Sequence, residues 1–170
     1  MTAKRLTITA AVVLALFTLT VTHAQSTVTT SLTTSLNGSF FFNNGDQSEW
    51  IDISGTVHLV IKSIPGNPVI PGNPIRVHAN MAGVTGLGRT SGQQYVINGD
   101  ENFEFDNTLP AALQFEGHYR LIPGNPVIPG NPIAPSPVLP VAFSVSLDEA
   151  GVVGNVAAVV NSDELPPPTN

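Results

Sequence analysis

Apolar and polar residues alternate with a period of two along most of the chain between residues 49 and 160. The runs 56–62, 76–81, 111–121 and 140–147 show this alternation clearly. A two-residue period places side chains on opposite faces of a β-strand, and no window keeps the spacing of an amphipathic helix. We therefore predict an all-β fold of about eight or nine strands, with no helix outside the N-terminal segment.

A proline-rich repeat interrupts the strands. The residues 64–75, IPGNPVIPGNPI, return unchanged at 122–133. Pro-Gly suits the centre of a type II turn and proline has no backbone N–H, so neither copy can be a central strand. We predict proline-rich arms at 64–75 and 122–137, each joining the two strands of a hairpin; a recognition loop for a proline-reading partner is the alternative. If the arms lie side by side, they mark one end of the domain and its functional rim.

Even spacing and hairpin-type connections predict an antiparallel barrel, up-and-down or partly open, with a β-sandwich as the alternative. The sequence Asn98-Gly99-Asp100 predicts a hairpin turn between strands at 94–97 and 102–105. The glycine-rich segment 83–92 has too many flexible positions for a regular strand interior, so we expect a bulge, a bend or a close backbone approach there.

The N-terminal segment 1–24 has the features of a secretory signal peptide. Lys4 and Arg5 precede an apolar run that ends at residue 21, and the small residue Ala24 follows. This pattern predicts cleavage after Ala24 and a secreted or periplasmic location, and an uncleaved N-terminal anchor is the alternative.

Composition divides the rest of the chain into three parts. Residues 25–35 are rich in Ser and Thr and predict a loose leader, with a first edge strand as the alternative. Residues 36–161 form one all-β domain. The polar, proline-rich residues 162–170 are expected to be a disordered tail.

Charge and cysteine content exclude several functions. Cleavage of the signal would leave four basic residues against twelve acidic ones, a net charge of about −8, which disfavours binding to a nucleic-acid backbone. The chain has no cysteine, which excludes thiol catalysis and thiolate metal sites. With 42% hydrophobic and 11% charged residues, stability must come from an apolar core.

Three histidines share the polar faces of the predicted strands. An even hairpin register would place His58 directly across from His78 or one diagonal step away. With His118, and with Glu116 or Asn80, they are candidate metal ligands, although no cofactor is required. Polar side chains bonded across strands are the simpler interpretation. As an enzyme, the domain would use four residues as its acid–base candidates: His58, His78, Glu116 and His118.

The opposite face supplies a candidate ligand site. If the fold is a barrel, its lumen is lined by apolar side chains that could hold a small apolar ligand: Leu59, Phe103, Phe115 and Phe143. The chain has no nucleophile elbow, no zinc-protease motif and no phosphate-binding loop.

Several short segments resemble a diffuse family of secreted bacterial proteins of unknown function, known as hypothetical proteins. The matching segments are ISGTVHLV at 53–60, GVTGLG at 83–88, TSG at 90–92 with Tyr95, and YRLI at 119–122. The resemblance covers about residues 49–160 and implies a small all-β domain, but no activity, cofactor or catalytic residue. The chain departs from the family in its two proline-rich arms, where shorter loops are expected.

These observations favour a secreted, non-enzymatic β-domain that binds a small apolar ligand or a surface protein, with no nucleic acid and no membrane span after signal cleavage. Two alternatives stay open. One is an isomerase, cyclase or hydrolase that uses the polar-face residues. The other is an envelope or matrix component that makes contacts through the arms.

Overall fold

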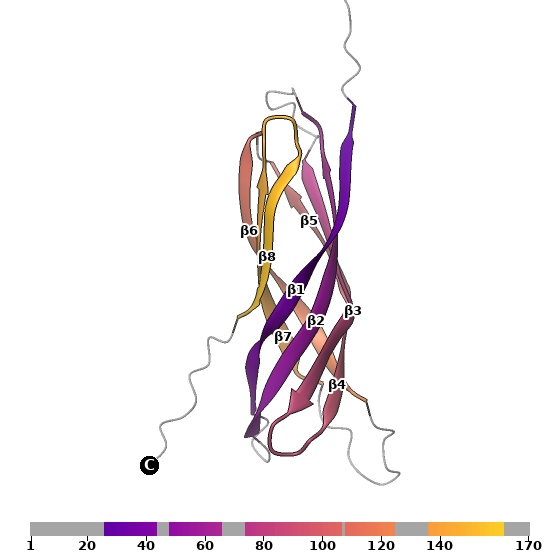
Figure 1. The fold of residues 1–170 in the computed structure, drawn as a ribbon, viewed down its shortest axis with the longest axis vertical. Coiled ribbons are helices and arrows are strands. Elements are labelled where there is room, and N and C mark those ends of the chain that lie inside the picture. The colour runs from indigo at the N-terminus through magenta and orange to yellow at the C-terminus, as the bar shows by residue number, and fades with distance from the viewer. Residues whose placement is uncertain (1–25, 44–47, 66–73, 107, 125–135, 162–170) are drawn as a thin grey trace, which may run out of the picture.

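The computed structural model describes residues 26–43, 48–65, 74–106, 108–124 and 136–161, and every regular element in them is a strand (Figure 1). The all-β prediction is therefore confirmed. The strands, in chain order, are β1 (Val28–Asn43), β2 (Ser48–Ser63), β3 (Ile75–Gly88), β4 (Gln94–Asn98), β5 (Asp100–Phe105), β6 (Ala111–Pro123), β7 (Val138–Leu147) and β8 (Val153–Val160).

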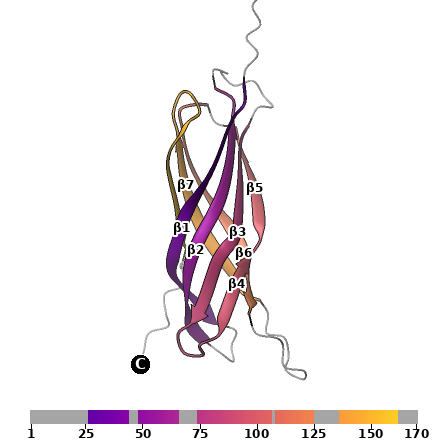
Figure 2. The same ribbon diagram turned by 45° about the vertical axis from the view of Figure 1, so that its right-hand side comes forward.

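The strands form one antiparallel sheet that curls into a nearly closed, elongated barrel (Figures 1 and 2). Its order is β1-β2-β3-β4-β6-β7-β8, and β5 also pairs with β3. Apart from β5, consecutive strands neighbour one another, as the up-and-down alternative requires, and the sandwich alternative is not adopted. Within the described ranges, no helix is long and apolar enough to cross a membrane.

β4 and β5 do not form the hairpin that Asn98-Gly99-Asp100 predicted. Both pair with β3, β4 along Thr85–Leu87 and β5 along Ile75–Asn80, so they continue one line across the sheet. Gly99 has a φ of 140°, and its carbonyl accepts a hydrogen bond from the backbone N–H of Met81 at 3.1 Å. At Gly99 the chain does not reverse direction but continues from β4 into β5 after a local irregularity, because β3 is long enough to pair with both strands.

Since β4 and β5 share one place in the sheet, the eight described strands occupy seven positions. With antiparallel neighbours throughout, the first and last positions must run in the same direction. β1 begins beside Ser63, its register partner being Val28, and Ser63 Oγ donates a 3.2 Å hydrogen bond to the carbonyl of Gly151, just before β8. The two edge strands thus start at the same end of the barrel.

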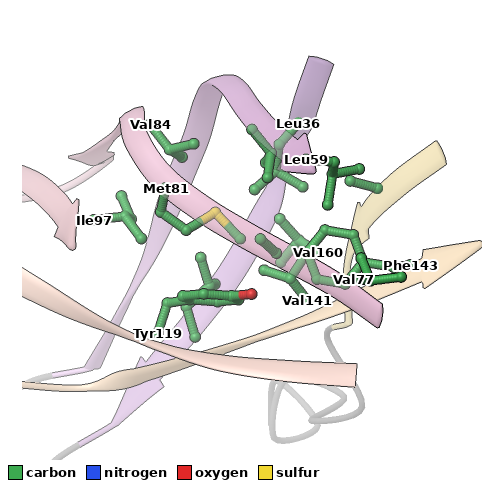
Figure 3. Packing of buried hydrophobic residues seen from close by; sticks show 14 of the residues in the cluster. Leu36, Leu59, Val77, Met81, Val84, Ile97, Tyr119, Val141, Phe143 and Val160 are labelled. Carbon is green, nitrogen blue, oxygen red and sulfur yellow. The ribbon is translucent and has the colours of Figure 1, made fainter. Parts of the chain in front are cut away.

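The interior is filled by the apolar half of the alternating pattern. Val57, Leu59 and Ile61 of β2 are at most 1% exposed. Tyr119 and Phe143 contact each other edge to face, with ring centroids 6.4 Å apart (Figure 3). One core cluster contains inward-facing residues from every strand except β5, whose two phenylalanines pack against it half-buried.

The expected Ser/Thr leader is wrong from residue 28 onward. Residues 28–35 form the first half of β1 and pair with residues 56–63 of β2. Their β-branched threonines suit a pleated surface, so the edge-strand alternative is the one the structure adopts. The predicted signal peptide and tail lie outside the described residues.

Each proline-rich arm joins two antiparallel neighbours, β2 with β3 and β6 with β7, as predicted. Most of both arms lies outside the described residues, but their roots are placed. The first arm leaves β2 beside Ser63, near Gly151. The second leaves β6 after Pro123, which pairs with Tyr95 at the other end of the barrel. The roots of the two arms therefore lie at opposite ends of the barrel, because β2 and β6 run in opposite directions.

The glycine-rich segment is part of a strand as far as Gly88, contrary to the expectation of irregular backbone, but the predicted bulge and close approach are both present. The register of β2 and β3 shifts between Thr56 and His58. Beside the shift, Gly55 has a φ of 148°, and a Cβ there would collide with the Gly83 carbonyl and lie 2.6 Å from Val84 Cα. The bulge needs glycine at residue 55 because the two backbones touch.

Candidate functional site

His58 and His78 lie on the outer face of neighbouring strands, one diagonal step apart, as the register argument predicted. His58 pairs with Asn80, and His78 pairs with Val60. The two rings have separate partners. His58 Nε2 shares a 2.8 Å hydrogen bond with Ser31 Oγ on β1, whereas His78 Nδ1 shares a 3.1 Å bond with Asn102 Oδ1 on β5. Each histidine is thus hydrogen-bonded to the neighbouring strand that lies away from the other histidine.

His118 lies on β6, with β4 and β5 between it and the strand of His78. Its Nε2 is 3.1 Å from Glu116 Oε1 on the same exposed face. The other oxygen of Glu116 accepts a hydrogen bond from Asn161 Nδ2 at 2.5 Å. These contacts connect β6 to the end of β8.

In the described part of the chain, no three His, Cys, Asp or Glu side chains lie close enough together to hold a metal ion. The proposed ligands His58, His78 and His118 are instead divided among three strands and three different hydrogen-bond partners. The interpretation of polar side chains bonded across strands describes His58 and His78, whereas His118 contacts Glu116 of its own strand.

The four lumen candidates lie in or against the core. Phe115 contacts Phe103 at 4.5 Å between ring centroids and stacks on Phe143 at 5.0 Å, and Leu59 is fully buried. Phe105 contacts the same ring at 5.3 Å. The rings fill the space between β5, β6 and β7 by packing on one another.

A groove of about 520 Å³ opens on the outer side of β2, β3 and β5. Eight residues line it: Val60, Lys62, Arg76, Val77, His78, Asn102, Phe103 and Glu104. Six of them come from two rows that cross the three strands in register. Val60 pairs with His78, which pairs with Asn102, and Lys62 pairs with Arg76, which pairs with Glu104. His78, a candidate from the sequence, thus lines a hollow of the outer surface, whereas the side chain of Phe103 faces the core from the same part of β5.

Charge distinguishes this groove from the acidic chain around it. Arg76 Nε donates to Glu104 Oε1 at 2.8 Å, and both side chains are 60% exposed. Lys62 has no ion-pair partner among the described residues. In a chain with a net charge of −6, the groove therefore carries one uncompensated positive charge beside the apolar side chain of Val60.

Sequence reasoning missed Lys62, Arg76, Asn102 and Glu104. A partial signal for the first two was present, because a hairpin centred on the arm at 64–75 brings Lys62 to within one residue of its observed register partner Arg76. The contribution of β5 could not be found this way, since the predicted hairpin at Asn98-Gly99-Asp100 would have paired the strand of Glu104 with β4. In the structure it pairs with β3.

A second polar cluster holds the turn between β3 and β4. Both oxygens of Asp52 accept bonds from Arg89, the shortest being 2.7 Å, and Ser39 Oγ donates to the same carboxylate at 2.8 Å. The bonds from Arg89 and Ser39 lower the pKa of Asp52. The Arg89 guanidinium also lies over the Trp50 ring at 5.8 Å. The polar groups of this cluster bond to one another, which indicates a structural role.

Tyr119 differs from the polar groups above because its buried hydroxyl has no hydrogen-bond partner among the described residues. Its ring is 1% exposed, and its hydroxyl is the one buried side-chain oxygen or nitrogen of the described residues without a hydrogen-bond partner. Burial, with a smaller contribution from the nearby Glu101 carboxylate, raises the pKa of this phenol. Glu101 Oε1 accepts the backbone N–H of His118 at 3.0 Å.

Four apolar side chains are 41% to 49% exposed near the root of the second arm: Leu87, Val96, Ile122 and Val138. Val96 and Ile122 are register partners on β4 and β6, and the other two lie on the flanking strands. Large contiguous exposed apolar areas are typical of contact surfaces, and these four side chains lie on neighbouring strands at one end of the barrel.

Comparison with protein-family models, with curated proteins and with solved structures finds no match to this chain.

Proposed function

We propose that the protein is a secreted, non-enzymatic β-barrel domain that binds a small ligand in the groove of β2, β3 and β5. The ligand combines an apolar body with one anionic group. The observation that carries the proposal is the unpaired Lys62 in a groove whose volume, about 520 Å³, lies within the range of small-molecule sites.

The lining suggests how such a ligand would be held. Lys62 supplies a point charge for a carboxylate, sulfate or phosphate group. Val60 offers apolar surface for the body of the ligand, and Asn102 offers an amide for a further hydrogen bond. Arg76 already forms an ion pair with Glu104, so Lys62 is the cation of the groove that can bind an anionic group without breaking that pair.

Binding is favoured over catalysis because the acid–base candidates are separated. His58 shares its hydrogen bond with Ser31 outside the groove, and His118 is paired with Glu116 on β6. A mechanism that uses two of these candidates as acid and base would need both within reach of one substrate. His78 is the one histidine that lines the groove.

The test uses octanoate, which has a carboxylate on an apolar chain, and octanol, which has the same chain without the charge. Backbone amide shifts in NMR spectra should change with octanoate at residues 60–62, 76–78 and 102–104. Lys62→Gln should weaken octanoate binding about fivefold, as for an exposed ion pair of about 1 kcal/mol. Arg120→Gln, which removes an exposed cation from β6 outside the groove, is the matched control.

Equal affinities for octanoate and octanol would refute the role of the charge. Equal weakening in the Lys62 and Arg120 variants would do the same, because it would reflect the net charge of the chain and not the groove.

A further inference from the structure

The barrel has an unpaired seam between its two edge strands. β1 and β8 end the strand order, so each has a ladder with one neighbour only. They approach closely along part of their length, and a Cβ on Gly38 would lie 2.9 Å from Val160 Cβ. Toward the end at which both strands begin, their ribbons separate (Figures 1 and 2). The seam is thus closed where the end of β8 meets the middle of β1, and it is open toward the end at which both strands begin.

Burial along β1 shows where a neighbour is missing. The four inward-facing residues of its first half are only half-buried: Val28, Thr30, Leu32 and Thr34. Their register partners on β2 are all at most 1% exposed: Ser63, Ile61, Leu59 and Val57. Near the closed part of the seam the difference disappears, since Leu36 is fully buried.

β8 shows the same gradient. Val153 and Val156 are half-buried, although their partners on β7, Leu147 and Val145, are 3% and 2% exposed. At the closed end of the seam, Val160 is 7% exposed. The interior is therefore incompletely covered along the same half of both edge strands.

Neither edge strand carries the usual protection against pairing with another chain. Edge strands of natural sheets commonly contain a charged residue or a proline that blocks further pairing. β1, VTTSLTTSLNGSFFFN, and β8, VGNVAAVV, contain neither. Their free edges are therefore chemically able to accept a strand.

The direction of the strands defines what would fit between them. Seven positions make the two edges parallel to each other, so a regular antiparallel closure is impossible. One added strand, running in the opposite direction, would be antiparallel to both edges and would make the number of positions even. Such a strand would need about eight residues to cover the open half.

We propose that the open half of the seam, residues 28–35 of β1 and 153–157 of β8, is a strand-addition site for an extended segment of a partner polypeptide. The backbone would supply hydrogen bonds on both sides, as in other cases of strand addition. Apolar side chains at every second position would cover Leu32 and Val156. The segment is uncharged and free of proline, which matches the two neutral edges and the requirement for a full ladder.

A free segment suits the site better than the folded barrel of a second copy. In a second copy, β1 is already paired along all 16 of its residues with β2 and has one edge to offer. Two chains that each carry a net charge of −6 also repel one another. The site is separate from the groove of β2, β3 and β5, so the two proposals can fail independently.

The experiment uses the chain from Gln25 onward and, in parallel, the full chain. The probe is a peptide with capped ends that alternates Thr and Val over about eight residues, the length of the open half. Amide hydrogen exchange should slow about tenfold or more at residues 28–35 and 153–157, because amides that gain ladder bonds become protected. A control peptide has proline in place of a central Val.

Two variants make the location specific. Thr34→Lys places a charge on the inward side of the open half and should weaken peptide binding about tenfold or more, because the added strand would bury that charge. Ser54→Lys places the same charge on the exposed face of β2 and should leave binding within about twofold, as for a surface substitution. Unchanged exchange in β6 and β7 checks that both variants are folded.

Absence of protection at saturating peptide would overturn the proposal, and so would protection in other strands or equal binding of the proline peptide. Protection of residues 28–35 without peptide, rising with protein concentration, would assign the site to a second copy instead. Binding to the chain from Gln25 but not to the full chain would assign it to the chain's own N-terminal segment.

Discussion

Gly55 offers the sharpest test of the β2–β3 contact. Its φ of 148° lies in a region that residues with a side chain rarely adopt. A Cβ at this position would collide with the Gly83 carbonyl and lie 2.6 Å from Val84 Cα. Both obstacles are backbone atoms, so Gly55→Ala cannot be accommodated by turning a side chain away.

The cost has two parts. Forcing an L-residue into the positive-φ region costs about 1–2 kcal/mol. Moving β3 away from β2 at the bulge adds about 1–3 kcal/mol, as in other overpacked sites. The sum of about 2–5 kcal/mol is a large share of a typical domain stability of about 5–15 kcal/mol. For a domain of this size it corresponds to a fall in Tm of roughly 6–18 °C.

Gly92→Ala is the matched control. Gly92 also has a positive φ, 67°, but a Cβ there would meet nothing within 4 Å. It should therefore cost only the conformational part, about 1 kcal/mol. Urea unfolding followed by circular dichroism measures both variants. If the two variants lose the same stability, or if Gly55→Ala loses less, the close approach of β2 and β3 at the bulge is refuted.

Three further predictions concern side chains. Arg89→Gln should lower stability near neutral pH and should have little effect in acid. The bond from Arg89 lowers the pKa of Asp52 in the folded state, so the stability it contributes is present above the pKa of the unfolded chain and is lost as the pH falls through the pKa of the folded state. Urea unfolding at neutral pH and at about pH 2.5 measures the difference, and an equal effect at both would contradict it. Tyr119→Phe should leave the free energy of unfolding unchanged or raise it by up to about 1 kcal/mol, because it removes a buried hydroxyl that has no partner; a loss in urea unfolding would show that the hydroxyl has a bound partner. Phe115→Ala should cost about 3–4 kcal/mol, since its ring contacts three others between β5 and β7, and hydrogen exchange in β5 should become faster than in β1.

The alternating pattern predicted the faces of the long strands because burial repeats with the same two-residue period. Val57 and Leu59 face the core and His58 faces outward, as the sequence indicates. The diagonal placement of His58 and His78 followed from the same period, since both positions lie on one face of a hairpin. Periodicity does not determine which partner each ring selects, and Ser31 and Asn102 come from strands outside that hairpin.

Two errors came from reading local signals without knowing the neighbouring strand. Asn98-Gly99-Asp100 has the composition of a reverse turn, but β3 extends past it and pairs on both sides, so Gly99 makes an irregularity in place of a reversal. Residues 28–35 have few apolar side chains, yet β2 supplies a complete partner for their backbone. In both cases long-range pairing outweighs local preference.

The groove was beyond sequence reasoning for the same reason. It depends on three strands in one register, and its third strand, β5, was assigned to the wrong neighbour. Once β5 is placed beside β3, Glu104 falls next to Arg76 and Asn102 next to His78 without further assumptions.

The odd number of positions also determines how the barrel would respond to mechanical load. The described chain enters β1 at one end of the barrel and leaves β8 at Val160, which lies beside Gly38 and about 25 Å further along the barrel for tilted strands. Tension between the two chain ends would pull β1 and β8 in opposite directions along their own axes. Their ladders with β2 and β7 would be sheared, with many hydrogen bonds loaded together, and not opened one bond at a time. An even number of positions would bring both ends to the same rim and allow the sheet to be peeled apart.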